Sequence, residues 1–504
     1  MSKTPVTCAV ADLGSNTFHL MIADVDGTKF TVIDKIRYPV RLASGFDEER
    51  NLTEEAMQRG FEILEMYGQR LKDFHPKFVK IVGTNALRIA KNSRDFVSRA
   101  TQIVGYPVEV ISGFEEARLI YLGVARSIES DGQNRLLIDI GGGSSELVIG
   151  KDFNPIDMES LDVGCLSTTV DYFPDGVVTK ERMHKAVISA GLKIQPFVKY
   201  MKKIGWEKAI GSAGSIIAVG KVLERKGWTN GEITFDALDM LRKELVSDGR
   251  FKGEDYPEIS QDRANAFAGG AAVLYGLMKN LDIDTIIPCD GGLREGMLLD
   301  LFGKIEHQDI RDTAIRQFAQ DYKYDENQSE RVATAANHIF AAVCEKLELN
   351  DIQCENYLRW ASIVFETGLA VSHAKYHKHS AYLVKHSDLA GFTREEQQVL
   401  RFIVVGHRKS FPAYILEKVP ECDRYKVTVL CIIFRLAVLF CRSRNYVPIE
   451  EIQFEADEFS LDLIFPCDWL DKNPLTEADL LLEQQALNDS GWKLNFVTQQ
   501  KNTN

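Results

Sequence analysis

Two segments of the chain repeat one pattern of apolar and polar positions. In each segment an apolar run ends at an aspartate, a short glycine-containing stretch follows, and a second apolar run begins. The first copy covers residues 6–23 and includes Asp12, and the second covers residues 136–149 and includes Asp139. Apolar runs of strand length separated by a glycine-containing break indicate two strands joined by a tight turn. The sequence therefore predicts two similar hairpins at widely separated positions.

Strands and helices alternate in the first quarter of the chain. A run at 54–74 places apolar residues near helical spacing, and strand-like runs follow the first hairpin at 30–36, 78–82 and 108–111. Such alternation is typical of an α/β lobe, which we assign to residues 1–126. The polar stretch 127–134 reads as a linker, and a second α/β lobe, assigned to residues 127–307, begins with the second hairpin.

Strand signals nearly vanish after the second lobe. Helical runs dominate residues 308–448, at 309–318, 330–346, 357–371, 394–404 and 425–440. The final segment, residues 449–504, alternates apolar and polar positions before a short helical run, which favours a small α+β domain. The predicted fold is therefore α/β with two related lobes, followed by a mainly α domain and a small α+β domain.

Composition is that of an ordinary globular protein of 504 residues, with 45% hydrophobic and 26% charged residues. The net charge of −13 argues against general nucleic-acid binding, so a polyanionic substrate would need a locally basic surface or bound cations. The nine cysteines include no CxxC pair, which favours reduced thiols in a cytosolic protein. We expect no signal peptide, and no apolar stretch is long enough to span a bilayer.

The two predicted turns carry residue types that bind phosphate and metal. Glycine lets the backbone turn sharply and lets its N–H groups approach an anion. The candidate phosphate-binding residues of the turns are Gly14, Ser15, Asn16, Gly142, Gly143 and Ser144. Asp12 and Asp139 end the strands, and Glu146 follows the second turn; together they are candidate Mg²⁺ ligands.

Glu116 is a candidate general base. Ser112 and Glu115 have the spacing of a capping box, which gives Glu115 a structural role and leaves Glu116 in the first helical turn at the mouth of the cleft. There it would deprotonate a water aimed at phosphorus. The alternative is a solvated acid that the helix dipole favours.

Further strand-to-helix turns carry anion-binding residue types. Asn85 and Arg88 follow the strand at 78–82, and the planar fork of a guanidinium suits phosphoryl oxygens. Gly214 and Ser215 lie in a small-residue turn before a helical run expected to start at residue 216, and Arg294 follows another glycine turn. The alternatives are an exposed arginine and tight helix packing.

Five of the ten histidines fall late in the chain, beside lysines and arginines. The members of this basic zone are His373, Lys375, His377, Lys378, His379, Lys385, His386, His407, Arg408 and Lys409. His373 and His377 have helical i,i+4 spacing, but acidic partners for a metal are not evident. We therefore interpret the zone as a basic surface rather than a metal site.

Together these motifs resemble the exopolyphosphatase/guanosine pentaphosphate phosphohydrolase family, within the superfamily of actin, sugar kinases and the Hsp70 ATPase. The resemblance rests on residues 12–19 (DLGSNTFH), 83–88 (GTNALR), 111–120 (ISGFEEARLI), 139–148 (DIGGGSSELV), 293–296 (LREG) and 379–383 (HSAYL). It implies two actin-like (ribonuclease H-like) lobes, a helical domain similar to HD-type phosphohydrolases and a small fourth domain. It also implies a homodimer whose helical domains help to form a long basic channel.

The resemblance also implies roles for single residues. Glu116 would be the catalytic base, Arg88 would orient the terminal phosphoryl group, and Asp139 and Glu146 would bind Mg²⁺ or the attacking water. The expected reaction is hydrolysis of the terminal phosphoanhydride of inorganic polyphosphate, with guanosine 5′-triphosphate,3′-diphosphate (pppGpp) as the alternative substrate or a second one. K⁺ is a further candidate cofactor, and the expected location is the cytoplasm, with at most peripheral attachment to the inner membrane.

One position departs from the family pattern. Phe365 stands where long members usually carry a histidine. A phenyl ring cannot ligate a metal, so we expect no HD-type metal centre and expect the helical domain to serve binding and dimer contacts. A sugar or acetate kinase, a chaperone ATPase and a non-catalytic nucleotide sensor are the alternatives on the same fold, and Glu116 beside its helix cap favours hydrolysis.

Overall fold

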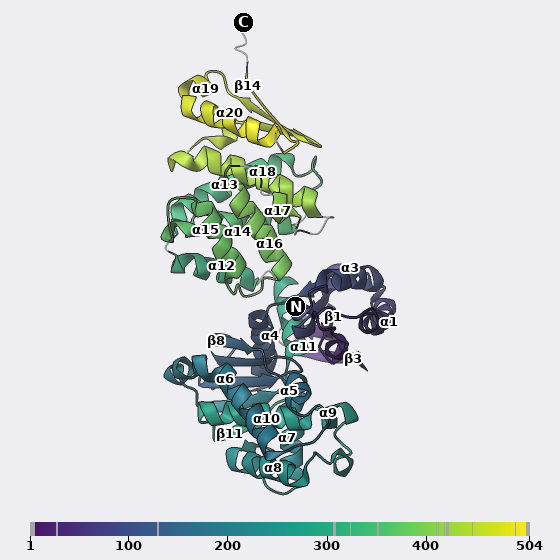
Figure 1. Cartoon of the computed structure of the whole chain (residues 1–504). Helices are drawn as coiled ribbons and strands as arrows, with labels where there is room; N and C mark the ends of the chain where they lie inside the picture. Colours follow the sequence, from purple (N-terminus) through teal and green to yellow (C-terminus); the bar gives the residue numbers. More distant parts are fainter. Residues whose placement is uncertain are drawn as a thin grey trace. The chain divides into compact units, whose positions relative to one another are not determined.

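A computed structural model describes residues 6–26, 29–128, 131–305, 309–322, 324–349, 352–409, 411, 413–417, 419, 423–445, 447–488 and 490–499. These residues belong to two compact units, Met1–Gln308 and Asp309–Asn504, whose elements are labelled in Figure 1. Part of the expected linker at 127–134, the end of the second lobe near residue 307, and Cys422 lie outside the described residues.

The first lobe is built on a five-stranded sheet in the order β3-β2-β1-β4-β5. Its strands are β1 (Val6–Leu13), β2 (Thr17–Asp26), β3 (Lys29–Pro39), β4 (Val79–Gly83) and β5 (Val108–Val110). The first three strands are antiparallel neighbours, and β4 and β5 continue the sheet in parallel with β1. Helices α1 (Glu54–Leu71) and α3 (Ser93–Val104) supply apolar side chains to its core.

The second lobe has a six-stranded sheet in the order β10-β11-β9-β6-β7-β8. Its strands are β6 (Asn134–Ile140), β7 (Ser145–Lys151), β8 (Asn154–Leu161), β9 (Lys208–Ser212), β10 (Ile233–Thr234) and β11 (Thr285–Pro288). The helices that cover it are α5 (Cys165–Tyr172), α6 (Lys180–Ile204), α7 (Ala213–Arg225), α8 (Phe235–Asp248) and α10 (Phe267–Leu281).

The two predicted hairpins are confirmed, and they match in register. Asp12 on β1 pairs with His19 on β2, and Asp139 on β6 pairs with Glu146 on β7. In both lobes the hairpin is extended by a third antiparallel strand on one side and a parallel strand on the other. The repeated sequence pattern therefore corresponds to a repeated piece of structure.

Two helices of the first unit pack backbone against backbone. These are α4 (Gly113–Arg126) and α11 (Leu293–Ile305). A Cβ atom added to Gly296 would lie 1.7 Å from the Leu119 carbonyl oxygen, and one added to Gly123 would lie 2.1 Å from the Gly292 carbonyl oxygen. Glycine is therefore required for this approach, and it fixes how closely the helices pack.

The second unit is mainly helical. Its helices are α12 (Ile310–Asp321), α13 (Glu326–Val343), α14 (Ile352–Val364), α15 (Tyr376–His386), α16 (Arg394–Gly406), α17 (Ala413–Leu416) and α18 (Arg424–Phe440). The helix expected at 357–371 ends at Val364 and gives way to a short 3-10 turn, Thr367–Ala370. Helix α13 begins before the expected residue 330 because the side chain of Asp325 caps it by accepting a hydrogen bond from the Gln328 amide.

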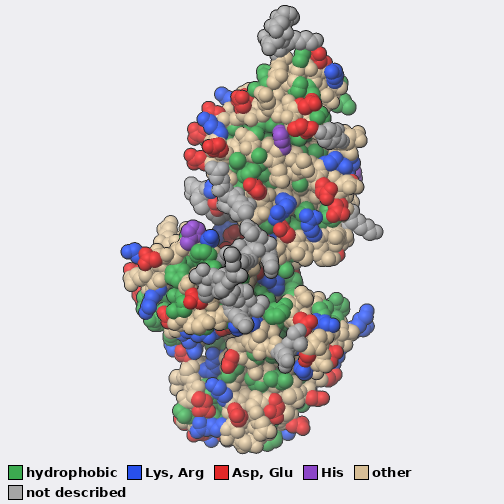
Figure 2. Space-filling model, turned by 180° about the vertical axis from the view of Figure 1, so that it is seen from behind, with side chains coloured by type: hydrophobic (Ala, Val, Ile, Leu, Met, Phe, Trp, Pro, Cys, Tyr) green, Lys and Arg blue, Asp and Glu red, His purple; other side chains and the backbone are tan. Residues whose placement is uncertain are grey.

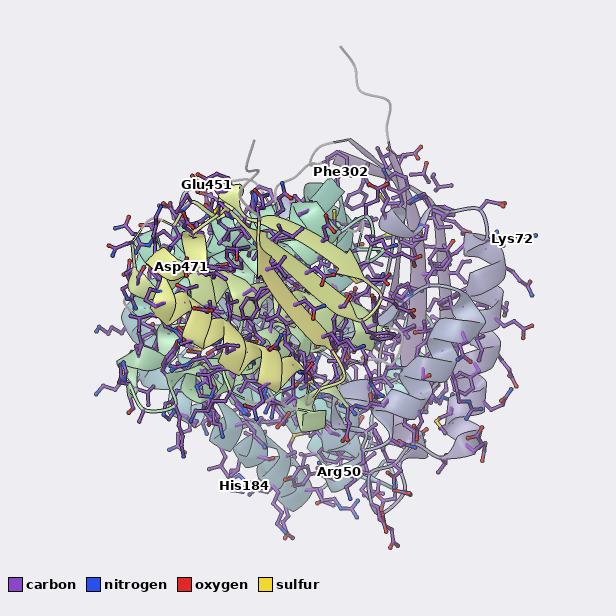
Figure 3. The ribbon with its side chains drawn as sticks, turned by 90° about the horizontal axis from the view of Figure 1, so that it is seen from above. Arg50, Lys72, His184, Phe302, Glu451 and Asp471 are labelled. Carbon is purple, nitrogen blue, oxygen red and sulfur yellow. The ribbon has the colours of Figure 1, made fainter. Side chains whose placement is uncertain are left out.

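A small sheet closes the second unit. It contains β12 (Gln453–Asp457), β13 (Ser460–Phe465) and β14 (Lys493–Thr498), with α19 (Trp469–Lys472) and α20 (Pro474–Asn488). Figure 3 shows these strands side by side with α20 next to them. The sheet shares one apolar core with the helices before it. None of the described helices is both long and apolar enough to cross a membrane.

The prediction of a basic surface late in the chain is wrong for two of its ten residues. His377 on α15 and His407 after α16 are only 2% and 4% exposed. The ring of Phe365 lies edge-on to His407, with 5.5 Å between ring centroids. The ring of Phe434 makes edge contacts with both of these rings. Packing between α15, α16 and α18 therefore draws both imidazoles inside. On the face shown in Figure 2, basic and acidic side chains are interspersed.

Candidate active site

A cavity of about 550 Å³ in the first unit is lined by residues of both lobes. Both hairpin turns face it. The predicted site residues that line it are Asp12, Gly14, Ser15, Asn16, Asn85, Glu116, Asp139, Gly142, Gly143, Ser144, Gly214, Ser215 and Arg294. The other two, Arg88 and Glu146, contact residues of this set or lie beside them. The fold thus gathers residues that are far apart in the sequence around one space.

The second turn lies close to the first lobe. A Cβ atom added to Gly143 would lie 2.3 Å from Oδ1 of Asn85, which begins the short helix α2 (Asn85–Ile89). No side chain other than hydrogen fits at that position without moving Asn85. The turn of one lobe and the helix start of the other therefore meet at the cavity wall.

Glu116 lies in the first turn of α4, as the capping pattern predicts. The hydroxyl of Ser112 accepts a hydrogen bond from the Glu115 amide at 3.1 Å, and the Glu115 carboxylate accepts two bonds of 2.8 Å from Arg118. Glu116 itself is 8% exposed and lines the cavity. The helix start therefore directs one acid into the protein and the next toward the cavity.

Arg88 connects Glu116 to the second turn. Its Nη1 donates to Oε2 of Glu116 at 2.5 Å, and its Nη2 donates to the hydroxyl of Ser144 at 3.4 Å. The guanidinium is held where it contacts both a carboxylate and a turn suited to phosphate. A planar fork in this place can exchange a carboxylate for phosphoryl oxygens.

Three more carboxylates lie beside Glu116 in the site. Burial, followed by the charge of Glu116, raises the pKa of Asp12 to about 7 and that of Glu146 well above its ordinary value. Burial also raises the pKa of Asp139 to about 6, although a hydrogen bond from Ser212 opposes the rise. Ser160 donates to Glu146 at 2.9 Å. These acids repel one another, so a cation or a proton would relieve the repulsion.

The residues present fit a divalent cation. Within the described part of the chain, Oδ1 of Asp12 is buried without a hydrogen-bond partner. Carboxylate oxygens are the ligands that Mg²⁺ prefers, together with water and substrate phosphates. No three His, Cys, Asp or Glu side chains among the described residues already form a coordination group. A cation here would therefore complete its shell from water and from the substrate.

Sequence reasoning missed the basic residues of the cavity. His19, Lys35, Arg37 and Arg263 also line it. Nδ1 of His19 lies 3.0 Å from Nη1 of Arg294, and burial, followed by Arg294, lowers the pKa of His19 to about 3. Lys35 and Arg37 are two apart on β3, so strand alternation could have placed them on one face. Arg263 gave no local signal.

The small-residue turn differs from its prediction. Helix α7 begins at Ala213, so Gly214 and Ser215 lie within its first turn rather than before it. A Cβ atom added to Gly214 would lie 2.0 Å from Nη1 of Arg263. The glycine therefore makes room for the guanidinium, which lies over the start of the helix.

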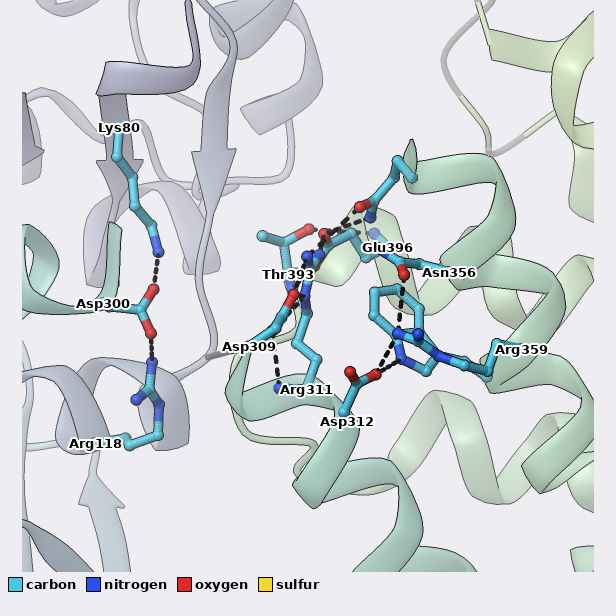
Figure 4. Close-up of polar contacts among 12 residues, drawn as sticks. Lys80, Arg118, Asp300, Asp309, Arg311, Asp312, Asn356, Arg359, Thr393 and Glu396 are labelled. Atoms are coloured by element: carbon cyan, nitrogen blue, oxygen red, sulfur yellow. Dashed lines mark hydrogen bonds and ion pairs between the residues drawn. The ribbon is translucent and has the colours of Figure 1, made fainter. Parts of the chain in front are cut away.

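Polar contacts join the two lobes around the cavity. Arg41, after β3, pairs with Asp262 on α9 (Gln261–Asn265) at 2.5 Å. Deeper in the protein, Asp300 accepts hydrogen bonds from Lys80 at 3.0 Å and from Arg118 at 2.5 Å (Figure 4). These contacts tie α4, β4 and α11 together behind the site.

Comparisons with known proteins agree over nearly all of the chain. The Ppx/GppA phosphatase family matches residues 21–305, and domain III of the Ppx/GppA phosphatases matches residues 310–484. A guanosine-5'-triphosphate,3'-diphosphate pyrophosphatase of Vibrio cholerae is 34% identical over 498 residues, which cover 98% of each chain. The protein of the same name from Photobacterium profundum is 32% identical over 499 residues, covering 98% of this chain and 99% of its own.

Solved structures of similar fold cover about three fifths of the chain. The crystal structure of the Aquifex aeolicus Ppx/GppA family member has a TM-score of 0.52 and 25% identity, covering 60% of this chain and 99% of that one. An exopolyphosphatase from Cytophaga hutchinsonii has a TM-score of 0.54 and 23% identity, covering 60% and 98%. These neighbours have the actin-like fold, which confirms the expected fold class. The chain therefore belongs to the Ppx/GppA phosphatase family and is a hydrolase that acts on phosphoanhydride bonds.

Proposed function

We propose that this protein hydrolyses the terminal phosphoanhydride of pppGpp and releases orthophosphate. The observation that carries the proposal is the Glu116–Arg88 pair, joined at 2.5 Å and placed between two glycine turns at one cavity. We favour pppGpp over polyphosphate because relatives that match 98% of the chain are named for hydrolysis of this nucleotide. Polyphosphate, which the sequence had favoured, becomes the alternative substrate of the same site.

The arrangement supports direct attack by water. The backbone N–H groups of the two turns would hold phosphate oxygens, and Arg88 would turn its fork from Glu116 toward the terminal phosphoryl group. Glu116 would then accept a proton from a water whose oxygen forms a bond to the terminal phosphorus. The bridging P–O bond breaks, and its electron pair leaves on the 5′-diphosphate oxygen of guanosine 5′-diphosphate,3′-diphosphate. The protein contributes positioning and charge neutralisation and forms no covalent intermediate.

Asp12, Asp139 and Glu146 would hold Mg²⁺ in this site. A bound divalent cation neutralises charge on the transferred phosphoryl group and on the leaving oxygen. If this is so, Asp139→Asn raises the Mg²⁺ concentration needed for half-maximal rate, while Asp175→Asn, on the exposed surface, leaves it unchanged. K⁺ is a further candidate that replacement by Na⁺ in the assay would test.

A steady-state comparison of substrates tests the proposal. Orthophosphate release by the full chain with Mg²⁺ is measured on pppGpp, GTP, ATP and long-chain polyphosphate. We expect the highest kcat/KM on pppGpp, and we expect Glu116→Gln to lower kcat by about 10²- to 10⁴-fold, the usual range for a lost general base. Glu65→Gln, an exposed acid on α1, is the matched control.

Three outcomes would contradict parts of the proposal. Full activity of Glu116→Gln would show that Glu116 is not the general base. A higher kcat/KM on polyphosphate than on pppGpp would make polyphosphate the preferred substrate. Phosphoryl transfer from ATP to a sugar or acetate would support a kinase instead. The homodimer and the cytoplasmic location stay predictions, and light scattering of the purified chain would test the first of them.

A further inference from the structure

The second unit contains a cavity of its own, with a volume of about 800 Å³. Its wall is formed by α16, α17, α18 and α20 and by the segments that flank the strands of the small sheet. Five of its lining residues are aromatic: Phe402, Phe411, Tyr425, Phe459 and Trp492. Sites for small molecules typically have volumes of about 300–1,000 Å³ and a mostly apolar, aromatic wall. The cavity therefore has the size and the wall of a small-molecule site.

Three of the aromatic rings meet in one part of this wall. The ring centroids of Tyr425, Phe459 and Trp492 are between 5.7 and 6.1 Å apart. Phe402 and Phe411 form a second pair, with 6.3 Å between their centroids. Aromatic rings attract a further ring in edge-to-face or offset geometry, and this attraction adds to the gain from buried area. The wall therefore favours a flat aromatic group over an aliphatic group of similar size.

Hydrogen bonds to the backbone hold the wall in place before any ligand binds. The Tyr425 hydroxyl donates to the Glu458 carbonyl at 3.0 Å, and the Trp492 amide donates to the Leu487 carbonyl at 3.0 Å. A preformed site loses little conformational freedom on binding. Phe459, in contrast, is 50% exposed, so a ligand that covers it would remove apolar surface from water.

One guanidinium lies in this apolar wall without a counter-charge. Arg424, the first residue of α18, lines the cavity. Its Nε and Nη2 donate to the backbone carbonyls of Val419 and Glu417, each at 3.1 Å, which fixes the side chain but leaves Nη1 outside both bonds. Within the part of the chain that the structure describes, no carboxylate pairs with Arg424. A carboxylate or phosphate of a ligand would supply the missing charge through strong, charge-assisted hydrogen bonds.

Acidic residues near the cavity do not compete for this role. Burial, followed by the charges of Glu458 and Glu348, raises the pKa of the Tyr425 hydroxyl. Neither acid is among the described residues that line the cavity, and Arg424 is the only charged side chain among them. The charge that a ligand meets inside the cavity is therefore positive.

We propose that this cavity binds a small aromatic anion, whose flat ring packs against Phe459 and Trp492 and whose carboxylate or phosphate is held by Arg424. The inference goes beyond the proposed function, because it concerns the second unit and involves no reaction. An aromatic carboxylate and a nucleoside monophosphate share this chemistry, so the experiment includes both.

A series of probes tests the ligand class on the full wild-type chain. Calorimetry measures the Kd of indole-3-acetate, adenosine 5′-monophosphate (AMP), cyclohexylacetate and tryptamine. Cyclohexylacetate keeps the carboxylate but lacks an aromatic ring, so its Kd should be about 3- to 10-fold above that of indole-3-acetate. Tryptamine keeps the ring but is a cation, so its Kd should be at least about tenfold higher. Whichever of indole-3-acetate and AMP has the lower Kd identifies the source of the anionic group.

Two variants then test the assigned contacts. Arg424→Gln should raise the Kd of the bound anion about 10- to 100-fold, the range for a lost hydrogen bond to a charged group. Phe459→Leu should raise the Kd of indole-3-acetate about 3- to 10-fold and leave that of cyclohexylacetate nearly unchanged. Arg442→Gln is the matched control, because Arg442 pairs with Asp479 and is not among the described residues that line the cavity.

Several outcomes would overturn the inference. These are no binding of either aromatic anion, tighter binding of tryptamine than of both anions, or a Kd that Arg424→Gln and Phe459→Leu leave unchanged. AMP can also enter the cavity of the first unit, so its binding supports the inference only if Arg424→Gln weakens it. Arg424 bonds to backbone carbonyls, so the melting temperature of Arg424→Gln is measured as well. If that variant does not fold, Phe459→Leu decides the question, because half of the Phe459 side chain is exposed and its replacement leaves the core intact.

Discussion

Arg118 on α4 donates a hydrogen bond of 2.5 Å to Asp300 on α11, in the interior of the first unit (Figure 4). The same guanidinium holds Glu115, the neighbour of Glu116, and the same carboxylate accepts a bond from Lys80 on β4. Helix α11 also carries Arg294. One buried carboxylate therefore ties the helix of the proposed base to the helix of a cavity arginine.

Replacing Asp300 by asparagine should strongly destabilise the protein. Lys80 and Arg118 would be left as buried cations with less compensation, and breaking a buried ion pair typically lowers the free energy of unfolding by about 3–5 kcal/mol. Urea unfolding of the full chain would measure this. Asp282→Asn is the matched control, because Asp282 forms its ion pair with Lys202 at the surface. Similar midpoints for the two variants would contradict the assigned role of the network.

Gly296→Ala should disturb the contact between α4 and α11. The added Cβ atom would lie 1.7 Å from the Leu119 carbonyl oxygen, and backbone cannot rotate away as a side chain can. We expect a lower melting temperature together with a lower kcat, because α4 carries Glu116. Gly292→Ala is the comparison, since its nearest contact would be the Glu295 Oε2 atom at 3.9 Å. A melting temperature unchanged in Gly296→Ala would show that the helices can separate freely.

Loss of Arg88 should lower kcat far more than it raises KM. Its guanidinium contacts both Glu116 and Ser144, so we assign it to the phosphoryl group during the reaction. Removal of one such stabilising donor typically lowers kcat about 10²- to 10³-fold. Arg88→Lys should recover only part of the rate, because an ammonium lacks the planar fork. Arg94 is an exposed arginine of the same lobe, so Arg94→Ala should keep the full rate. If Arg88→Ala changed only KM, Arg88 would instead contribute to binding of the ground-state substrate.

The second unit should lose stability as the pH falls below about 6.5. Burial lowers the pKa of His407 to about 3 and that of His377 to about 4. The unfolded chain therefore binds protons that the folded chain excludes, and each such histidine lowers the free energy of unfolding by at most about 1.4 kcal/mol per pH unit, until the pH reaches its folded pKa. Hydrogen exchange of peptides from α16 and α18 between pH 7 and pH 4.5 would measure the loss.

His407→Gln tests the source of this acid sensitivity. Without the imidazole, protection of α16 should depend less steeply on pH, even if the variant is less stable at pH 7. His184→Gln is the control, because His184 is exposed on α6 and projects outward (Figure 3). The same pH dependence in His407→Gln and in the wild-type chain would assign the sensitivity to other groups.

The sequence predicted the acids of the site because each has its own local signal. Asp12 and Asp139 end apolar runs and precede glycine turns, and Ser112 marks the helix start that places Glu116. Strands, turns and helix caps depend on neighbouring residues in the chain, so the sequence alone predicts them. The fold class followed from the same signals and from the family motifs.

The basic half of the cavity had no comparable signal. Arg37 reaches it because β3 pairs with β2, and Arg263 reaches it because the second lobe faces the first; neither event is visible in the flanking residues. The prediction that His407 belongs to a basic surface was wrong for the opposite reason. Its neighbours Arg408 and Lys409 indicate a charged surface, whereas packing against Phe365 places the imidazole in the core.

Cross-strand pairing places Asp12, His19 and Arg37 in one row of the first sheet, and the corresponding row of the second sheet contains Asp139, Glu146 and Ser160. The first row is basic beyond its aspartate and the second is acidic, which has a consequence for how such a protein diversifies. Each hairpin belongs to its own sheet and its own core. A substitution that alters the first copy can change which molecules are admitted and still leave the acids of the second copy in place. Asp12 itself belongs to the proposed metal site, so this freedom is limited to the positions of the first copy that lie beyond its aspartate.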